Sequence, residues 1–327
     1  MKYELLIERG RNTGIWQQPA VIEPVTWETY RKESPSKLTF TVIKDPVLGF
    51  NEGARVKFKV DGKNVFLGYV FTKQRTKDQH IQVTAYDQLR YLKNKHSYFF
   101  SNITATEFIR RMSSDFLLNT GTLDNSRHVI GELAYVDQTL FDMVQTTIDE
   151  TVLSTKNLYV LYDDFGKLTL KNIKDLKLNY VVNPDNTEDF DYATTIDNDT
   201  ASRVLIVKAS DDKGVEKYYA EDYETGLEDW GVLQRYEKWG DNENEAQAKA
   251  RAKAMLELYG SKTRSLTATG CYGDVRVRAG TSVLVKLSLG DLPTLCNYML
   301  VEEAKHTFEQ GHHTMDLTFR GRKEFYG

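Results

Sequence analysis

The chain contains 327 residues, which is long for one hydrophobic core, so two to three domains are expected. A formal net charge of -4 and a sequence pI near 6.0 leave no basic surface for nucleic acid, and no lysine or arginine cluster lies beside aromatic side chains. The two cysteines, Cys271 and Cys296, do not make a disulfide framework, and neither a signal peptide nor an apolar run of about 18 residues is predicted.

The N-terminal third alternates apolar and polar residues in short runs, which is typical of half-buried strands. Residues 2–9 and 38–42 are two such runs. The segment between them contains Pro19 and Pro24 and is expected to be irregular up to Tyr30. This part of the chain therefore predicts strands joined by an irregular connection.

Residues 56–94 predict an antiparallel meander followed by a short helical turn. Asp61 and Gly62 supply the turn residues of the first hairpin, and a polar bend closes the second. Asp87 is expected to cap the helical turn that follows the last strand. Residues 1–95 are therefore predicted to form the first β domain.

Helical periodicity replaces the alternation after residue 95. Thr104 and Glu107 form a capping box at the start of one helix, and a second helix is predicted over residues 139–153. The apolar stripe of the first helix consists of Phe108, Ile109, Met112 and Phe116. That of the second consists of Leu140, Val144, Ile148 and Val152. A hairpin is expected around residues 163–166, so residues 96–182 are predicted to form a small α+β domain.

Residues 183–189 are polar and contain a proline, so they are predicted to link this domain to a second β domain that spans residues 183–327. A buried strand is expected at residues 203–209. Residues 216–240 mix acidic residues with aromatic ones in a loop-like setting. We interpret this segment either as a surface for a partner or as a loop packed onto its own domain.

A helix is predicted over residues 242–259, inserted into the second β domain. Asn242 and Glu245 are expected at its start, and Gly260 follows its end. Small residues recur four positions apart and predict a face that packs closely on a sheet or another helix. That face consists of Ala246, Ala250, Ala254 and Leu258.

The end of the chain repeats the pattern of the meander. Residues 53–60 and 280–287 both begin with glycine and carry apolar residues at the same offsets. The second strand of the first meander is centred on Tyr69–Val70, and that of its repeat on Tyr298–Met299. In the third strand, Ile81, Val83 and Ala85 of the first meander match Met315, Leu317 and Phe319 of the repeat. The repeat indicates either an internal duplication or the chance similarity of two antiparallel meanders.

The predicted fold is therefore α+β but mainly β. Two related antiparallel β-barrel-like domains lie at the two ends of the chain and flank a smaller α+β domain.

No catalytic, cofactor-binding or metal-binding residue is predicted. His306, His312 and His313 cluster near a turn, but the last two are adjacent and would point to opposite faces of a strand, so we interpret them as surface residues. Cys271 lacks the neighbouring base of a thiol nucleophile. Acidic pairs are too frequent to mark a site; examples are Asp149–Glu150, Asp163–Asp164 and Glu302–Glu303.

Residues 66–71 and 84–94 resemble the XkdQ/YqbQ family of tail hub proteins from contractile phage tails, defective prophages and tail-like bacteriocins. Residues 301–317 are similar to the C-terminal hairpin of that family. The resemblance covers essentially the whole chain in element order and length. It implies a structural baseplate hub that acts as a symmetry adaptor between a hexameric tail tube and a trimeric spike.

The resemblance also implies the partners and the location. A homotrimer would alternate its two β domains in a pseudo-sixfold ring, with the tail tube protein on one side and the spike protein on the other. The α+β domain would lie outside the ring, where baseplate wedge and other tail proteins could bind. The particle would be a virion or a tail-like particle assembled in the bacterial cytoplasm, with no contact to membrane or nucleic acid.

Two alternatives remain beside the hub. A tail-tip hydrolase of cell-wall glycan would need an acidic pair as acid and base. A carbohydrate-binding adhesion module would use the aromatic segment around Trp230 and Trp239. Because no hydrolase region follows Gly327, the protein is predicted not to be an enzyme.

Overall fold

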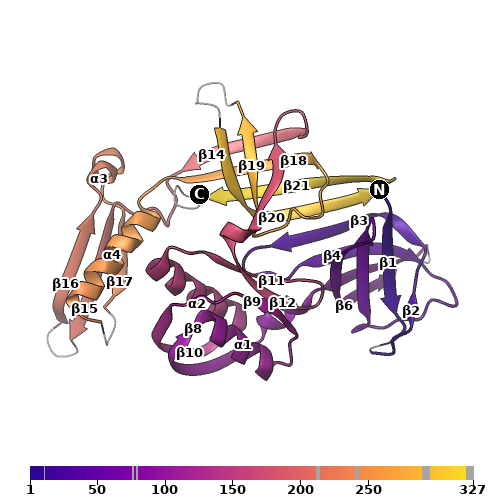
Figure 1. Cartoon of the computed structure of the whole chain (residues 1–327), viewed down its shortest axis with the longest axis horizontal. Helices are drawn as coiled ribbons and strands as arrows, with labels where there is room; N and C mark the ends of the chain where they lie inside the picture. The colour runs from indigo at the N-terminus through magenta and orange to yellow at the C-terminus, as the bar shows by residue number, and fades with distance from the viewer. Residues whose placement is uncertain are drawn as a thin grey trace.

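The computed structural model describes residues 1–10, 12–75, 77–78, 80–210, 214–239, 243–288 and 295–321. These residues form mostly antiparallel β-sheets, with four α-helices packed around them (Figure 1). No helix in the described part of the chain is both long and apolar enough to span a membrane.

The first β unit is formed by strands β1 to β7. Their bounds are β1 (Tyr3–Glu8), β2 (Trp16–Gln17), β3 (Val21–Tyr30), β4 (Lys37–Ile43), β5 (Arg55–Val60), β6 (Lys63–Arg75) and β7 (His80–Tyr86). Strands β5, β6 and β7 pair antiparallel in succession, which confirms the predicted meander. Asp61 and Gly62 join β5 to β6 with φ of 47° and 78°, the conformation of a type I′ hairpin turn. The following turn η1 (Gln88–Lys93) begins at Asp87, whose carboxylate accepts a hydrogen bond from the Leu89 N–H (3.0 Å).

The expectation of an irregular segment up to Tyr30 is wrong. Residues Val21–Tyr30 form strand β3, which pairs with β4 over most of its length. Pro24 lies where the pairing of β3 with β4 shifts register, between Ile22 and Thr26. Because the ladder is interrupted at that place, the missing N–H of proline is tolerated there.

The α+β region follows the first β unit. It consists of β8 (Lys95–Thr104), α1 (Ala105–Asp115), β9 (Thr120–Leu123), β10 (Val129–Thr139), α2 (Leu140–Thr155), β11 (Tyr159–Asp163), β12 (Leu168–Asn172) and η2 (Ile173–Leu176). The capping box of Thr104 and Glu107 and the buried stripe of α2 are confirmed. The β8–β10 ribbon was not predicted, because its strands pair across the helix between them and a register shift after Tyr135 breaks the alternation.

The second β unit contains the last strands of the chain. Their bounds are β13 (Lys177–Val182), β14 (Asp189–Thr195), β18 (Thr263–Tyr272), β19 (Ser282–Leu287), β20 (Leu295–Glu309) and β21 (His312–Gly321). Strand β20 also pairs antiparallel with β3, so one sheet continues from the second β unit into the first (Figure 1). No sheet closes on itself within the described residues, so two barrel-like domains are not confirmed.

An insertion separates β14 from β18 and projects to one side of the molecule (Figure 1). It consists of β15 (Arg203–Ser210), β16 (Gly214–Asp222), α3 (Glu224–Trp230), β17 (Gln234–Lys238) and α4 (Glu245–Tyr259). Residues 216–240 were expected to resemble a loop, but their described part contains two strands and a helix. The strand predicted at residues 203–209 is confirmed as β15, whereas β16, α3 and β17 were not predicted.

The start and the buried face of α4 differ from the prediction. Asn244 caps the helix through a capping box with Gln247, while the proposed cap Asn242 lies outside the described residues. The predicted face is exposed or half-buried, and the buried residues are instead Ala248, Ala252 and Met255. Alanines occur all around this helix, so small-residue spacing could not fix its rotation; the sheet formed by β15–β17 decides it.

The hydrophobic core is divided into four clusters. One lies in the first β unit, one in the α+β region, one in the second β unit and one in the insertion. Two residues of β20 pack outside the cluster of the second β unit. Phe308 packs in the cluster of the first β unit, and Leu300 packs in that of the α+β region. Strand β20 therefore connects three of the four cores.

Candidate assembly surface

The two β units follow the same strand path. In the first β unit the strands lie in the order β3-β4-β7-β6-β5-β1, and in the second in the order β14-β18-β21-β20-β19-β13. The members of each matching pair also occur in the same order along the chain. The outermost strands differ in direction, because β1 is antiparallel to β5 whereas β13 is parallel to β19.

The glycines that precede β5 and β19 make the same hydrogen bonds. The Gly53 N–H donates to the Val70 carbonyl (2.7 Å), and the Val70 N–H donates to the carbonyl of the residue after the glycine (2.9 Å). The corresponding bonds of Gly280 and Val301 are 2.8 and 2.9 Å. Both glycines have positive φ, 85° and 90°, a conformation that other residues rarely adopt. Val70 and Val301 therefore occupy equivalent positions.

The second strands of the two meanders also shift register at the same place. The pairing of β6 with β7 shifts directly after Val70, and that of β20 with β21 shifts directly after Val301. The predicted match of Tyr69–Val70 with Tyr298–Met299 is therefore wrong by two residues. Because side chains alternate with a period of two, a shift of two keeps the apolar pattern unchanged.

The two β units join through β20 and β3. The paired residues run from Glu303 opposite Tyr30 to Phe308 opposite Val25. Phe308 is fully buried, and its ring centroid lies 5.0 Å from that of Phe58 in the first β unit. The joint thus combines a backbone ladder with a shared hydrophobic core.

Two of the clustered histidines belong to this joint. His306 is fully buried, with its ring centroid 4.6 Å from that of Trp27, and its ring nitrogens lie 2.8 Å from the Val277 carbonyl and 2.9 Å from His313. Burial lowers the pKa of His306 to about 3 and the pKa of His313 to about 4. The interpretation of all three as surface residues is wrong for His306, while His312 is exposed.

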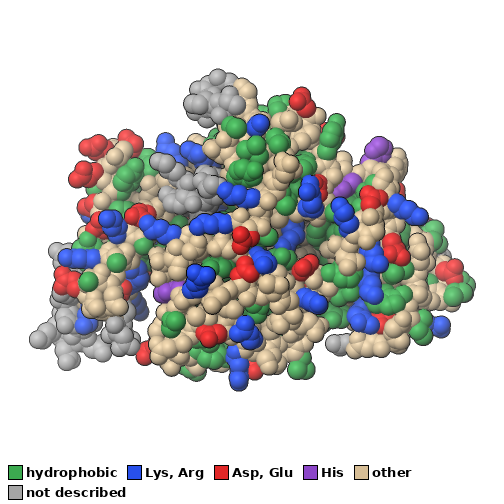
Figure 2. Space-filling model, viewed as in Figure 1, with side chains coloured by type: hydrophobic (Ala, Val, Ile, Leu, Met, Phe, Trp, Pro, Cys, Tyr) green, Lys and Arg blue, Asp and Glu red, His purple; other side chains and the backbone are tan. Residues whose placement is uncertain are grey.

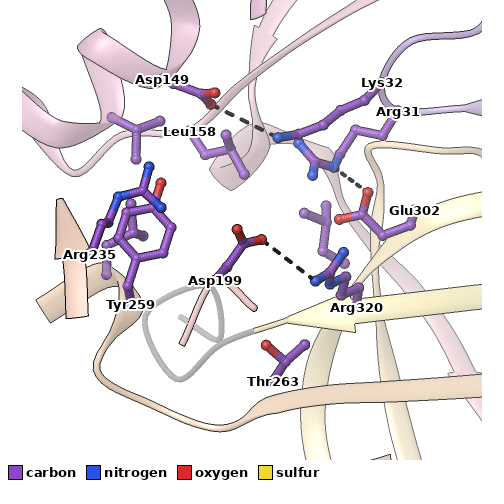
Figure 3. Close-up of a pocket in the computed structure, with 13 residues that line it drawn as sticks. Arg31, Lys32, Asp149, Leu158, Asp199, Arg235, Tyr259, Thr263, Glu302 and Arg320 are labelled. Carbon is purple, nitrogen blue, oxygen red and sulfur yellow. Dashed lines mark hydrogen bonds and ion pairs between the residues drawn. The ribbon is translucent and has the colours of Figure 1, made fainter. Parts of the chain in front are cut away.

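A cleft of about 350 Å³ lies where both β units, α2 and the insertion meet (Figure 3). Its charged lining residues are Arg31, Lys32, Asp149, Asp199, Arg235, Glu302 and Arg320. Arg31 lies 2.8 Å from Glu302, and Lys32 lies 4.0 Å from Asp149. The two other arginines also lie within 4.0 Å of a carboxylate. Each of these cations thus lies near a carboxylate, and the cleft marks a joint between regions of the chain.

A second buried charged cluster joins the α+β region to both β units. Asp87 comes from the first unit, Arg278 from the second, and Asp163 from β11. Burial, and then the charge of Asp163, raises the pKa of Asp87 well above its usual value, and burial raises the pKa of Asp163 to about 6. The Arg278 guanidinium lies 3.1 Å from the ring centroid of Tyr162, and burial lowers its pKa to about 10.

The remaining candidates from the sequence lie apart from one another. Cys271 is buried in the core of the second β unit, and burial raises the pKa of its thiol. Trp239 is buried against α4 and donates its indole N–H to the Glu243 carbonyl (2.7 Å). Tyr236 is 55% exposed. The described residues contain no group of three or more His, Cys, Asp or Glu side chains arranged to hold a metal.

Charge is interspersed on the face of the molecule drawn in Figure 2, where basic and acidic side chains lie among one another over all regions. This face therefore offers no continuous patch of one sign.

Several strand edges are unpaired within the described residues, and two of them lie at opposite ends of the run of strands from β14 to β6. Past Val70, residues 72–75 of β6 pair with β7 only, and β14 pairs with β18 only. An unpaired edge exposes backbone donors and acceptors that another strand can satisfy. These edges are the candidate assembly surface of the chain.

Comparison with known proteins identifies the family of this chain. The YQBQ-like family model matches residues 25–320. The chain belongs to the YQBQ-like family. A relative in Bacillus subtilis (strain 168), the phage-like element PBSX protein XkdQ, is 33% identical over 305 aligned residues, and the match covers 91% of either chain.

Solved structures show the same fold. The 43 kDa tail protein of prophage MuSo2 from Shewanella oneidensis matches the family member described here with a TM-score of 0.72 and 14% identity, and the match covers 100% of both chains. The E. coli c3393 protein, a component of the type VI secretion system with structural similarity to the T4 bacteriophage tail proteins gp27 and gp5, has a TM-score of 0.57 and 10% identity. That match covers 100% of this chain and 79% of the other.

Proposed function

We propose that the protein is the structural hub of a contractile tail baseplate, a symmetry adaptor between a hexameric tail tube and a trimeric spike. The observation that carries the proposal is the shared strand path of the two β units, with matching hydrogen bonds at Gly53 and Gly280. Three copies of a chain with two similar units present six similar seats, the number that a sixfold partner needs. The names of the relatives, a phage-like element protein and a prophage tail protein, point the same way.

In this proposal the two β units are copies of one barrel-like domain. The first domain would span residues 1–95 and the second residues 183–327, with the α+β domain of residues 96–182 between them. The separate hydrophobic clusters of the first β unit, the α+β region and the second β unit support this division except at β13, whose Val182 packs in the cluster of the second β unit. The long sheet that links the two units would form part of the ring wall.

The other parts of the chain would serve as attachment points. The α+β domain and the insertion lie off the shared sheet (Figure 1), so they would face away from the ring toward the baseplate wedge and other tail proteins. Tail tube protein and spike protein would bind the two open ends of the ring. The protein would act structurally rather than as an enzyme, in a virion or tail-like particle assembled in the bacterial cytoplasm.

Light scattering of the purified chain mixed with its tail tube protein tests the proposal. Three chains of 37.6 kDa give a hub of about 113 kDa, and we expect one such trimer for each tube hexamer. Electron microscopy of the same mixture should show a ring stacked on the tube. A mixture in which the tube protein assembles while the chain stays apart as a monomer would contradict the hub.

Zymography against peptidoglycan tests the rival function. Clearing that is reproducible and is lost when one carboxylate, such as Asp163 or Glu302, is changed to its amide would favour a glycan hydrolase instead.

A further inference from the structure

Each β unit has a hollow at the same place of the shared strand path. By the equivalence of the two meanders, Phe71 corresponds to Glu302, and Tyr86 corresponds to Arg320. Glu302 and Arg320 line the cleft of Figure 3, while Phe71 and Tyr86 line a groove of about 470 Å³ in the first unit. The connection between β3 and β4 also lines this groove, and that between β14 and β18 lines the cleft. The groove and the cleft are therefore counterparts.

In the second unit this place is covered by other parts of the same chain. Leu300 lines the cleft and is buried in the cluster of the α+β region, where Leu258 of α4 also packs. Asp149 of α2 lies 4.0 Å from Lys32 in the same cleft. The α+β region and the insertion thus bring both apolar and acidic side chains to this place.

The groove of the first unit is lined by aromatic rings that stay half-buried. The ring centroid of Phe71 lies 5.6 Å from that of Tyr86 and 6.1 Å from that of Tyr91. Phe71 lies where the pairing of β6 with β7 shifts register, and such a bulge redirects a side chain. Tyr30 of β3 also lines the groove. Phe71, Tyr86 and Tyr30 are all half-buried, so parts of their rings remain open to a partner.

The charged residues that line this groove are all basic. They are Lys37, Arg90 and Lys93, whereas the cleft of the second unit is lined by acidic residues as well. The Arg90 guanidinium lies 5.3 Å from the ring centroid of Phe71, and Lys93 is exposed. The expectation that no basic cluster lies beside aromatic side chains is therefore wrong at this groove. It could not be seen in the sequence, because the cations come from β4 and η1 and the rings from β3, β6 and β7.

We propose that this groove binds an acidic, amphipathic segment of another protein, which covers the first β unit as the α+β region and the insertion cover the second. Apolar side chains of the segment pack on the rings of Phe71 and Tyr86. Its carboxylates pair with Arg90 and Lys93. The inference does not depend on the proposed hub, because it follows from the comparison of the two units.

Two other occupants fit the groove less well. A second copy of the chain cannot offer the side chains that cover the cleft, because its Asp149 and Leu258 already line its own cleft. Nucleic acid needs a track of cations along its backbone, but basic and acidic side chains are interspersed on the face drawn in Figure 2. An acidic segment of a different protein matches both the charge and the apolar rings of the groove.

Photo-crosslinking tests the proposal. Thr72 lines the groove and is exposed, so Thr72→benzoylphenylalanine places a photoreactive side chain there. The full chain is irradiated in the cells that produce it, and mass spectrometry identifies the linked peptide. We expect a segment of another protein in which apolar and acidic residues alternate. A product with a second copy or with nucleic acid alone, or no product, would overturn the proposal.

The matched control lies on the same face of the sheet. Gln82 of β7 is exposed and precedes Tyr86 by four residues, a distance of about 13 Å along the strand. Gln82→benzoylphenylalanine should give about tenfold less of the same product. Equal yields from the two positions would mean that the partner does not lie in the groove.

Two substitutions separate charge from packing. Lys93→Glu and Phe71→Ala should each lower the yield of the Thr72 cross-link by about tenfold. Lys253→Glu, at an exposed position of α4, changes the net charge equally and should leave the yield unchanged. Lys93 is exposed, so Lys93→Glu should keep the unfolding temperature of the wild type, and an undiminished cross-link in this variant would refute recognition by charge.

A binding measurement with purified components completes the test. A synthetic peptide of the cross-linked segment should bind the purified full chain in fluorescence anisotropy. Replacing its carboxylates by amides should weaken binding by about tenfold or more. Equal affinity of the two peptides would overturn the assignment of an acidic partner.

Discussion

The two β units have the same strand path but different surroundings. In the second unit, the end of β20 covers β3 and buries Phe308 in the neighbouring core. In the first unit, the corresponding end of β6 is an open edge that carries Arg75, and Lys77 lies in the turn beyond it. One strand geometry can therefore carry an apolar joint in one unit and a charged open edge in the other.

The connections of the two units differ as well. Strands β3 and β4 are joined by residues 31–36, whereas the corresponding strands β14 and β18 are separated by residues 196–262, which include the insertion. A long insertion is tolerated at this connection because the cost of closing a loop rises only slowly with its length. The repeated core is thus kept while one connection becomes a separate lobe.

The largest effect is expected from the apolar joint. Phe308→Ala removes a fully buried ring that packs on Phe58, so the free energy of unfolding should fall by about 3–5 kcal/mol in urea denaturation. The matched change at the equivalent position, Lys77→Ala, concerns an exposed side chain and should alter stability by less than about 0.5 kcal/mol. Similar losses in both variants would contradict the assignment of the two ends.

The next largest effect compares the paired glycines. Gly53→Ala and Gly280→Ala both place a side chain at positive φ, which costs about 1–2 kcal/mol each. Gly280→Ala should cost more, because its new Cβ would lie 2.6 Å from Cγ1 of Val160, whereas nothing lies within 4 Å at Gly53. In a double-mutant cycle, adding Val160→Ala to Gly280→Ala should relieve the steric clash. The cost of placing alanine at positive φ should remain.

The buried histidines of the joint should make the stability of the protein depend on pH. The pKa of His306 is lowered to about 3 and that of His313 to about 4, so the fold favours their neutral forms. Their contribution to stability is complete above the unfolded pKa of about 6.5 and is lost as the pH falls toward these values, with a slope of about 1.4 kcal/mol per pH unit for each histidine.

His306→Phe keeps a ring beside Trp27 and should reduce that slope between pH 6 and 4 in denaturation experiments. His312→Ala, at the exposed neighbour, serves as the control and should leave the slope unchanged. A wild-type slope in the His306→Phe variant would show that the joint does not depend on a neutral imidazole.

The smallest effect is expected at the cluster that joins both units to the α+β region. Burial raises the pKa of Asp163 to about 6, so the stability that its protonated form contributes is lost as the pH rises from about 4 through 6. Asp163→Asn keeps an oxygen that can accept the Gly166 N–H and removes the charge. The variant should gain about 1 kcal/mol over the wild type at pH 8 and less at pH 4.

Thermal or urea unfolding at both pH values measures this difference. Asp164→Asn, at the adjacent position, is the control for the change in net charge. A loss of stability in Asp163→Asn at pH 8 would mean that the carboxylate is needed as an anion beside Arg278.

Local features were predictable because they depend on residues close in sequence. The Thr104–Glu107 capping box, the stripe of α2 and the hairpin turn at Asp61–Gly62 all follow from a few neighbouring side chains. The repeat of the two meanders was visible for the same reason. Strand β3 was missed because Pro24 indicates a break locally, while its partners lie farther along the chain.

Periodicity and turn residues, which act over a few positions, were enough to indicate the β-rich character, the starts of α1 and α2 and the presence of two similar meanders. The burial of His306, the buried face of α4 and the equivalence of Val70 with Val301 depend on contacts between segments far apart in the chain. The alternation of apolar and polar residues in a strand is unchanged by a register shift of two residues. The spacing of alanines in α4 does not fix which face of the helix is buried. Register and burial therefore depended on strands such as β3 and β20, which meet across more than 270 residues of chain.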